Sequence, residues 1–137
     1  MESEIKQISR SSYAVIGPEG ATNFGIIKGS DGSAVLMAAD IRRIDEIEEA
    51  LKLTGCAAVK YLIDTHEHFD HTSANFYFRQ RGVPIVGSAG CLGAMRDLGG
   101  PDFERMMQPV PELYERFPGL CLTLPDVVFA DATKLTL

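Results

Sequence analysis

The chain has 137 residues, of which 45% are hydrophobic and 23% are charged, and its formal net charge is −6. This length suits one domain with a hydrophobic core, so we expect residues 1–137 to form a single domain. The acidic balance argues against nucleic acid or an anionic membrane as the main partner, because both attract basic surfaces.

The cysteines and the first residues bear on where the protein works. Cys56, Cys91 and Cys121 are odd in number, widely spaced and free of any CxxC pair. This pattern favours reduced thiols over a disulfide framework or a zinc–thiolate site. Residues 1–12 lack the apolar segment of a signal peptide, and no run approaches the ~20 apolar residues of a membrane span. We therefore expect a cytoplasmic protein.

The first 40 residues predict strands. The turn Gly29-Ser30-Asp31-Gly32 separates two apolar runs and predicts a β-hairpin. The predicted strands cover Ile5–Ser9, Tyr13–Ile16, Thr22–Lys28 and Ser33–Ala38.

The next two elements are an amphipathic helix and a strand. Apolar residues recur at helical spacing through Ile41–Leu53, with Asp40 as the predicted cap and an end near Gly55. Ala57–Ile63 is an apolar run interrupted only by Lys60, which predicts a strand buried on both faces.

The second half predicts shorter elements. Gly82 should end a helix over Thr72–Arg81, and Ser88 should cap a helix that runs to Leu98. Glycines and prolines in Gly99–Gly119 predict two separate short helices. The full set is Thr72–Arg81, strand Pro84–Gly87, helices Ser88–Leu98, Asp102–Met107 and Glu112–Phe117, and the start of a hairpin in Val127–Leu137. Strands that alternate with helices predict an α/β fold with a mixed β-sheet and flanking helices.

All three histidines of the chain lie within six residues, in an HxHxDH pattern at 66–71. Imidazole and carboxylate groups are the side chains that bind first-row divalent metals. Their spacing is too tight for one helical face, so they would have to converge in a loop that curls around the ion. The segment follows the predicted strand directly, and the carboxyl ends of strands are where open α/β sheets bind ligands. We predict a metal site formed by His66, His68, Asp70 and His71, and four such ligands favour a dinuclear one.

The segment from Thr65 to Thr72 resembles the metal-binding signature of the metallo-β-lactamase fold superfamily. Its context is also similar to that family: an apolar strand before it, Ser73-Ala74-Asn75 and a helix after it, and then the strand at 82–86. The hairpin Asn23–Ala38 resembles the family's opening strands, and Pro125–Leu137 resembles the strand pair before its second half. The resemblance implies that residues 1–137 correspond to the first, N-terminal half of an αββα sandwich.

The resemblance also implies roles for the four residues. His66 and His68 would bind a first metal, and Asp70 and His71 a second, with Asp70 as the catalytic group that orients the attacking water. His68 stands where the di-iron, oxygen-reducing branch carries glutamate, so the zinc-type hydrolases are favoured, with iron and manganese still open. The family's aspartate at the end of an early strand has its nearest counterpart in Asp40.

Residues beside the pattern allow more than one interpretation. Asp64 is either a group that orients a histidine or the polar end of a strand. We expect Glu67 to be solvated and Phe69 to pack under the loop. Asn75 should begin a helix or bind nearby backbone.

No histidine lies outside the pattern, so the family's remaining ligands have no counterpart in these residues. A divalent metal lowers the pKa of water to about 7, and the predicted function is metal-dependent hydrolysis of an ester, thioester or amide in a small-molecule substrate. One or two Zn²⁺ ions would be the cofactor of this half-domain, whose dinuclear site is incomplete. The alternative is a non-catalytic metal-binding or self-assembling half-domain, natural or engineered.

Apolar residues point to both faces of the strands within 24–27, 35–37 and 57–63. Helices over 41–53 and 72–81 can cover only one of these faces, and large exposed apolar patches are rare in soluble monomers. We expect a partner on the other face, either a second copy in a homodimer or a complementary C-terminal half.

Overall fold

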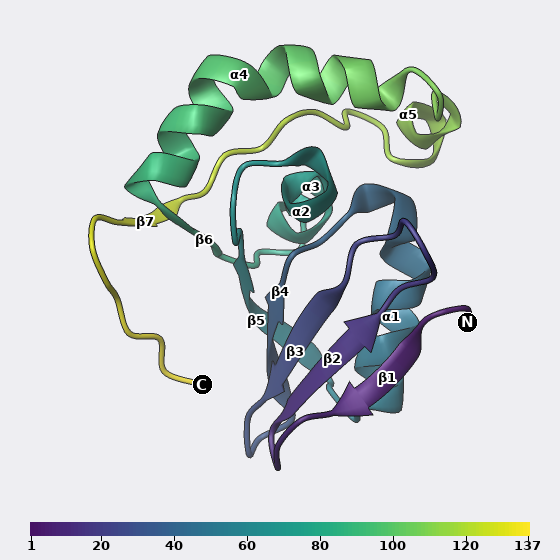
Figure 1. Ribbon diagram of the computed structural model, residues 1–137. Coiled ribbons are helices and arrows are strands. Elements are labelled where there is room, and N and C mark those ends of the chain that lie inside the picture. Colours follow the sequence, from purple (N-terminus) through teal and green to yellow (C-terminus); the bar gives the residue numbers. More distant parts are fainter.

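Seven strands form one mixed sheet in the computed structural model, which describes residues 1–137 (Figure 1). The strands follow one another across the sheet in the order of the sequence. The first four are antiparallel neighbours, and the remaining pairs are parallel. They are β1 (Glu4–Gln7), β2 (Ser12–Ile16), β3 (Phe24–Lys28), β4 (Ser33–Met37), β5 (Ala58–Ile63), β6 (Ile85–Ser88) and β7 (Val127–Phe129). The α/β class with a mixed sheet is confirmed.

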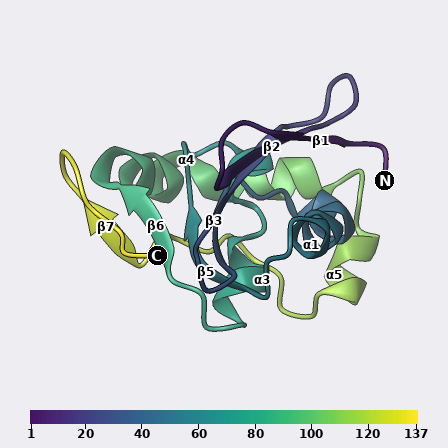
Figure 2. The same cartoon turned by 90° about the horizontal axis from the view of Figure 1, so that it is seen from below.

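Helical crossovers connect the parallel strands, as parallel pairing requires. They are the 3₁₀ segment η1 (Ile41–Arg43) and α1 (Ile44–Leu53), then α2 (Phe69–Thr72) and α3 (Asn75–Arg79), then α4 (Ala89–Met107) and α5 (Glu112–Arg116). In Figure 1, α4 arcs over the end of the sheet at which β5 stops, while Figure 2 shows α1 and α3 on one face. None of these helices combines the length and apolar character needed to cross a bilayer.

The helix-covered face of the sheet carries the core. Leu36 pairs with Ile26 on one side and Leu62 on the other, and all three side chains are fully buried. Ile47 and Leu51 of α1 belong to the same apolar cluster. Alternate residues of a strand point to opposite faces, so this row defines the face on which α1 packs.

The adjacent row of residues defines the opposite face, here called the open face. Met37 pairs with Gly25 and Ile63, and each of these residues is only half-buried. The last residues of the chain run back past β6 and β5 (Figures 1 and 2), and Leu137 reaches Gly29 in the β3–β4 turn. An apolar but partly exposed second face agrees with the sequence-based expectation.

Strand β5 differs from its prediction. Leu62 is its one buried residue, whereas Ala58 and Lys60 are exposed and Tyr61 and Ile63 are half-buried. A strand buried on both faces is therefore wrong, because helices cover only one face of this sheet.

Two local predictions are confirmed by capping contacts. The Asp40 carboxylate accepts a hydrogen bond from Arg42 N at 2.9 Å at the start of η1, and Ser88 Oγ accepts one from Cys91 N at 3.0 Å. Both satisfy backbone N–H groups that a helix leaves free at its first turn. The β3–β4 hairpin is also as predicted, and the three cysteines are not joined by a disulfide in the structure.

The helix predicted over Thr72–Arg81 is instead two short helices, α2 and α3. Ala74 N donates to Ala39 O at 3.1 Å, and Ser73 Oγ accepts from Ile41 N at 2.9 Å. These bonds attach the Ser73–Ala74 junction to the β4–η1 connection, so the helix breaks where tertiary partners replace helical ones.

The segment around Pro101 also differs from its prediction, because α4 runs unbroken through Gly99-Gly100-Pro101. A residue before proline normally avoids helical geometry because its Cβ clashes with the ring, and Gly100 has no Cβ. At Gly99, a Cβ would lie 2.9 Å from Leu122 Cδ2. The glycine pair therefore allows the helix to pass the proline and to pack closely against the segment before β7.

The predicted hairpin in Val127–Leu137 is wrong. Val127–Phe129 pairs in parallel with β6, and residues 130–137 form no strand. Asp126 holds this register, since its N–H donates to Ile85 O at 3.0 Å and its Oδ1 accepts from Ile85 N at 2.7 Å.

Candidate metal centre

The histidine segment lies at the carboxyl end of β5, where the chain turns into α2. His68 takes the cap position of α2 in an extended conformation, and His71 N donates to His68 O at 3.0 Å. One helical turn therefore brings His71 back towards His66. The segment was predicted to be a loop that curls around an ion, but its second part, with Asp70 and His71, is the short helix α2.

Strand β4 anchors this turn from the side. Ala38 adopts a φ of 65°, in the left-handed region that residues other than glycine rarely occupy. Its N–H donates to Ile63 O, and the next residue, Ala39, donates to His71 O, both at 3.1 Å. This backbone conformation places β4 and the histidine turn in direct contact.

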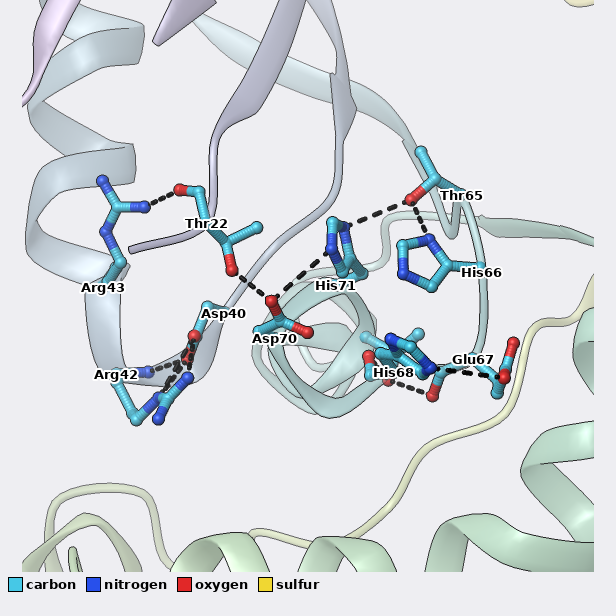
Figure 3. A network of polar contacts seen from close by, with 11 residues as sticks. Thr22, Asp40, Arg42, Arg43, Thr65, His66, Glu67, His68, Asp70 and His71 are labelled. Carbon is cyan, nitrogen blue, oxygen red and sulfur yellow. Dashed lines mark hydrogen bonds and ion pairs between the residues drawn. The ribbon is translucent and has the colours of Figure 1, made fainter. Parts of the chain in front are cut away.

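The three imidazole rings gather in one cluster (Figure 3). The ring centroid of His66 lies 3.9 Å from that of His71 and 4.6 Å from that of His68. Thr65 Oγ1 lies 3.1 Å from His66 Nδ1 and 3.3 Å from His71 Nδ1. A hydroxyl has one hydrogen, so Thr65 can donate to one ring and must accept from the other. It therefore orients both rings through their Nδ1 atoms.

Burial and charge favour neutral imidazole at His71. Its side chain is 20% exposed, against 66% for His68. Burial lowers the pKa of His71, and the neighbouring His66 and His68 lower it further, against the opposing effect of Asp70. A neutral ring keeps the lone pair that a metal ligand needs.

Asp70 lies on the other side of His71, with Oδ2 at 3.5 Å from His71 Nε2. The same oxygen accepts a hydrogen bond from Thr22 Oγ1, in the β2–β3 loop (Figure 3). Burial raises the pKa of Asp70, but the Thr22 hydrogen bond and the nearby histidines outweigh it, so the pKa lies below its usual value. The carboxylate is ionised at neutral pH.

Asp40 is held away from the cluster by Arg42. The ion pair measures 2.6 Å from Arg42 Nη2 to Asp40 Oδ2, and Asp40 is 4% exposed. All its side-chain hydrogen bonds go to Arg42. It caps η1, and no contact joins it to a histidine.

The hydrogen bonds of Asp64 distinguish between its two interpretations. Its Oδ2 accepts from Asn75 Nδ2 at 2.7 Å, and the same Nδ2 donates to Thr123 O at 2.9 Å. Burial raises the pKa of Asp64 to about 7. Asp64 thus binds Asn75 rather than a histidine, and Asn75 begins α3 and binds backbone, as predicted.

No model of a known protein family matches the chain. A hydroxyacylglutathione hydrolase of Chelativorans sp. (strain BNC1) is 37% identical over 68 residues, which cover 49% of this chain and 26% of that protein. The metallo-β-lactamase from Pontibacter korlensis superposes with a TM-score of 0.67 at 19% identity, over 98% of this chain and 56% of that one. The metallo-β-lactamase FIM-1 from Pseudomonas aeruginosa, in its mono-zinc form, gives 0.60 at 18% identity, over 72% of this chain and 47% of that one.

The chain has the metallo-β-lactamase fold. It spans about half the length of the solved metallo-β-lactamases and about a quarter of the curated relative. Its mixed sheet and flanking helices match half of the family's sandwich. That His66, His68, Asp70 and His71 bind metal stays a prediction.

The donor chemistry of the cluster fits a divalent metal of the metallo-β-lactamase type, since imidazole and carboxylate are zinc ligands. The positions of these side chains, however, do not form a complete metal site. No group of three or more His, Cys, Asp or Glu side chains converges so as to hold an ion. The His66 ring packs at 74° to the His68 ring and at 45° to the His71 ring. In this arrangement, the side chains do not direct three donor atoms at one point.

Sequence reasoning missed two hydroxyl groups. Thr65 lies within the segment and could have been suspected from its position, but Thr22 is 48 residues from Asp70 and carries no local signal. Glu67, expected to be solvated, has a side chain that is 36% exposed, with Oε1 at 3.6 Å from His68 Nε2. Phe69 packs as predicted, with its ring 5.4 Å from that of Phe103.

Proposed function

We propose that this chain contributes one half of the active centre of a metal-dependent hydrolase. His66, His68, Asp70 and His71 are its zinc ligands. The observation that supports this most is the packing of three imidazole rings beside an ionised carboxylate at the carboxyl end of β5. All three histidines of the chain therefore lie in this one cluster.

The residues of the chain have separate roles in this proposal. Thr65 orients His66 and His71, and burial keeps His71 neutral so that it can ligate. Thr22 holds Asp70, whose ionised carboxylate orients the attacking water and accepts its proton. A bound zinc ion would supply Lewis-acid activation of water and of the substrate carbonyl.

The remaining ligands would come from whatever covers the open face. A hollow of about 360 Å³ runs over this face, and its lining includes Gly25, Ile27 and Met37 together with Thr65 and His71. A surface packed on these apolar residues would therefore border the histidines directly. We propose that it is a complementary C-terminal half or a second copy of this chain in a homodimer.

The substrate class is a small molecule with an ester, thioester or amide bond. The relative named as a hydroxyacylglutathione hydrolase makes a hydroxyacylglutathione thioester the first compound to test. That relative is similar to less than half of this chain, so the substrate is a proposal and not an assignment.

A second candidate is a non-catalytic half-domain that binds metal or only self-assembles. Two observations favour it: no three donor side chains converge on one point, and the open face is apolar and partly exposed. In this case, the histidine cluster would bind one ion without turnover in any assembly.

Calorimetric titration with zinc chloride, on protein without a histidine tag, tests the ligand assignment. We expect one bound ion per chain and a clear loss of affinity in His68→Ala, with Glu112→Gln on α5 as a control that leaves binding unchanged. Equal affinity in His68→Ala and wild type would refute the assignment. Two tight sites per chain would show that the ligand set is already complete.

A further inference from the structure

A groove of about 570 Å³ lies between α1 and α3, at the end of the sheet opposite to the histidines. Its lining includes Val59 near the start of β5, whereas the histidine segment follows Ile63 at its end. Strand residues rise about 3.3 Å each, so Val59 lies roughly 13 Å from the end of β5 that the histidine segment follows. Small-molecule sites typically measure about 300–1,000 Å³, and this groove falls within that range.

The inner wall of the groove is apolar. Leu51 of α1, Phe78 of α3 and Val83 line it and are themselves buried members of the core. Because the core supports these side chains, the wall is already formed without a ligand. An apolar group of a ligand would lose water on entering it.

The rim of the groove is cationic, in a protein with a net charge of −6. Lys52 and Arg81 line it, and Lys28 Nζ lies 2.8 Å from the position that a Cβ on Gly55 would take. None of these three cations forms an ion pair with a carboxylate. Arg42, by contrast, is paired with Asp40.

Two further contacts determine which side chains of the rim are available to bind a ligand. The Arg81 guanidinium lies 3.4 Å from the centroid of the Tyr77 ring, and its Nη1 donates to Tyr77 O at 2.9 Å. Glu48, the one acidic residue in the lining, accepts a hydrogen bond from the Tyr77 hydroxyl at 2.8 Å. Arg81 is thus held in place with guanidinium N–H groups still free, and the three cations of the rim outnumber the single carboxylate.

We propose that this groove binds a small amphipathic carboxylate, of the kind of a medium-chain fatty acid. The carboxylate would accept charge-assisted hydrogen bonds from Arg81 and Lys52, and the alkyl chain would lie on Leu51, Phe78 and Val83. Charge complementarity favours an anion over a neutral or cationic ligand of the same length. The site is separate from the proposed zinc centre and needs no metal.

Titration of metal-free protein with sodium octanoate, followed by calorimetry, provides the first test. We expect one saturable site per chain, and about tenfold weaker binding for the Lys52→Gln/Arg81→Gln double variant. Arg96→Gln is the matched control, because Arg96 is also exposed and free of ion pairs but lies on α4. Octylammonium should not compete with octanoate.

Alkylation of the cysteines locates the site without relying on the variants. Cys56 lines the groove and is half-buried, whereas Cys121 is exposed and outside it. Octanoate should slow iodoacetamide alkylation of Cys56 and leave that of Cys121 unchanged, as followed by peptide mass spectrometry.

The proposal would be overturned by no saturable binding, by equal affinity in the double variant and in Arg96→Gln, or by equal protection of both cysteines. A change in the oligomeric state with octanoate would also overturn it, because the groove would then be an interface between copies of the chain. All these measurements use chelator-treated protein, so their failure is distinguishable from failure of the zinc assignment.

Discussion

The two faces of the sheet are built from the same kinds of residue but have different environments. On the helix-covered face, Ile26, Leu36 and Leu62 are fully buried under α1 and its neighbours. On the open face, Met37 and Ile63 are only half-buried, although Val35 and Val86 on the same face are buried. Apolar character alone therefore does not determine burial in this sheet; what packs on each face does.

This difference bears on function because the histidines border the open face. His71 and Thr65 line the same hollow as Gly25 and Met37. Whatever covers the open face would also enclose the histidine cluster. Under the proposed function, assembly on the open face and completion of the metal centre are one event.

The largest effect should come from truncating adjacent residues on opposite faces. Leu62→Ala should cost about 3 kcal/mol of unfolding free energy, as for a fully buried leucine, and Ile63→Ala about 1 kcal/mol, because its side chain is already partly exposed. Urea denaturation of metal-free protein at low concentration measures both values. Equal losses would mean that the open face is covered within the chain.

The next effect concerns the buried carboxyl group of Asp64, which contacts Asn75 at the start of α3. Its pKa is raised from 3.8 to about 7 in the folded protein. Between these values, the folded state binds a proton that the unfolded state lacks, so stability falls as the pH rises towards 7. From pH 5 to pH 8, wild type should lose about 2 kcal/mol relative to Asp64→Asn.

Urea denaturation at both pH values, in the presence of a chelator, measures this difference. Asp131→Asn is a suitable control, since Asp131 is exposed and has no ion pair. Parallel pH profiles for wild type and Asp64→Asn would show that Asp64 is ionised in the fold across this range.

A smaller effect is expected on self-association through the open face. Light scattering should give about twice the chain mass of 14.9 kDa at micromolar concentration, and Ile63→Glu should weaken the dimer at least about tenfold because a charge would be buried at its interface. Leu98→Glu, at a 61%-exposed position on α4, should leave the dimer intact. A clean monomer of wild type, without aggregation, would exclude a homodimer through this face.

The smallest expected effect is on turnover. The chain alone, with zinc, should hydrolyse a hydroxyacylglutathione or a β-lactam no faster than its zinc-free control, because incomplete ligation does not position a substrate. Chelator-sensitive turnover that disappears in Asp70→Ala would contradict this expectation. It would also show that copies of the chain can build a working centre.

Much of the fold was predictable because its signals are local. The Gly29–Gly32 turn predicts the β3–β4 hairpin, and Asp40 and Ser88 predict their caps through bonds to residues two or three positions away. The places where the structure departs from the predicted elements could not be predicted from local signals. Helix α2 ends near Ala74, which bonds to Ala39, and the unbroken α4 packs closely against Leu122 at Gly99, beside Pro101. Those partners are distant in the sequence.

The sequence by itself determined the chemistry of the candidate site, because the four donor side chains and Thr65 lie within seven residues. It also determined that strands alternate with helices, through hydrophobic periodicity and turn residues. Only the tertiary structure decided that Thr22 binds Asp70, that Ala39 donates to His71 O, and that Leu36 and Leu62 are buried while Met37 and Ile63 are only half-buried. The physical reason is range: capping and periodicity act over a few residues, whereas burial and these hydrogen bonds depend on which distant segments the fold brings together.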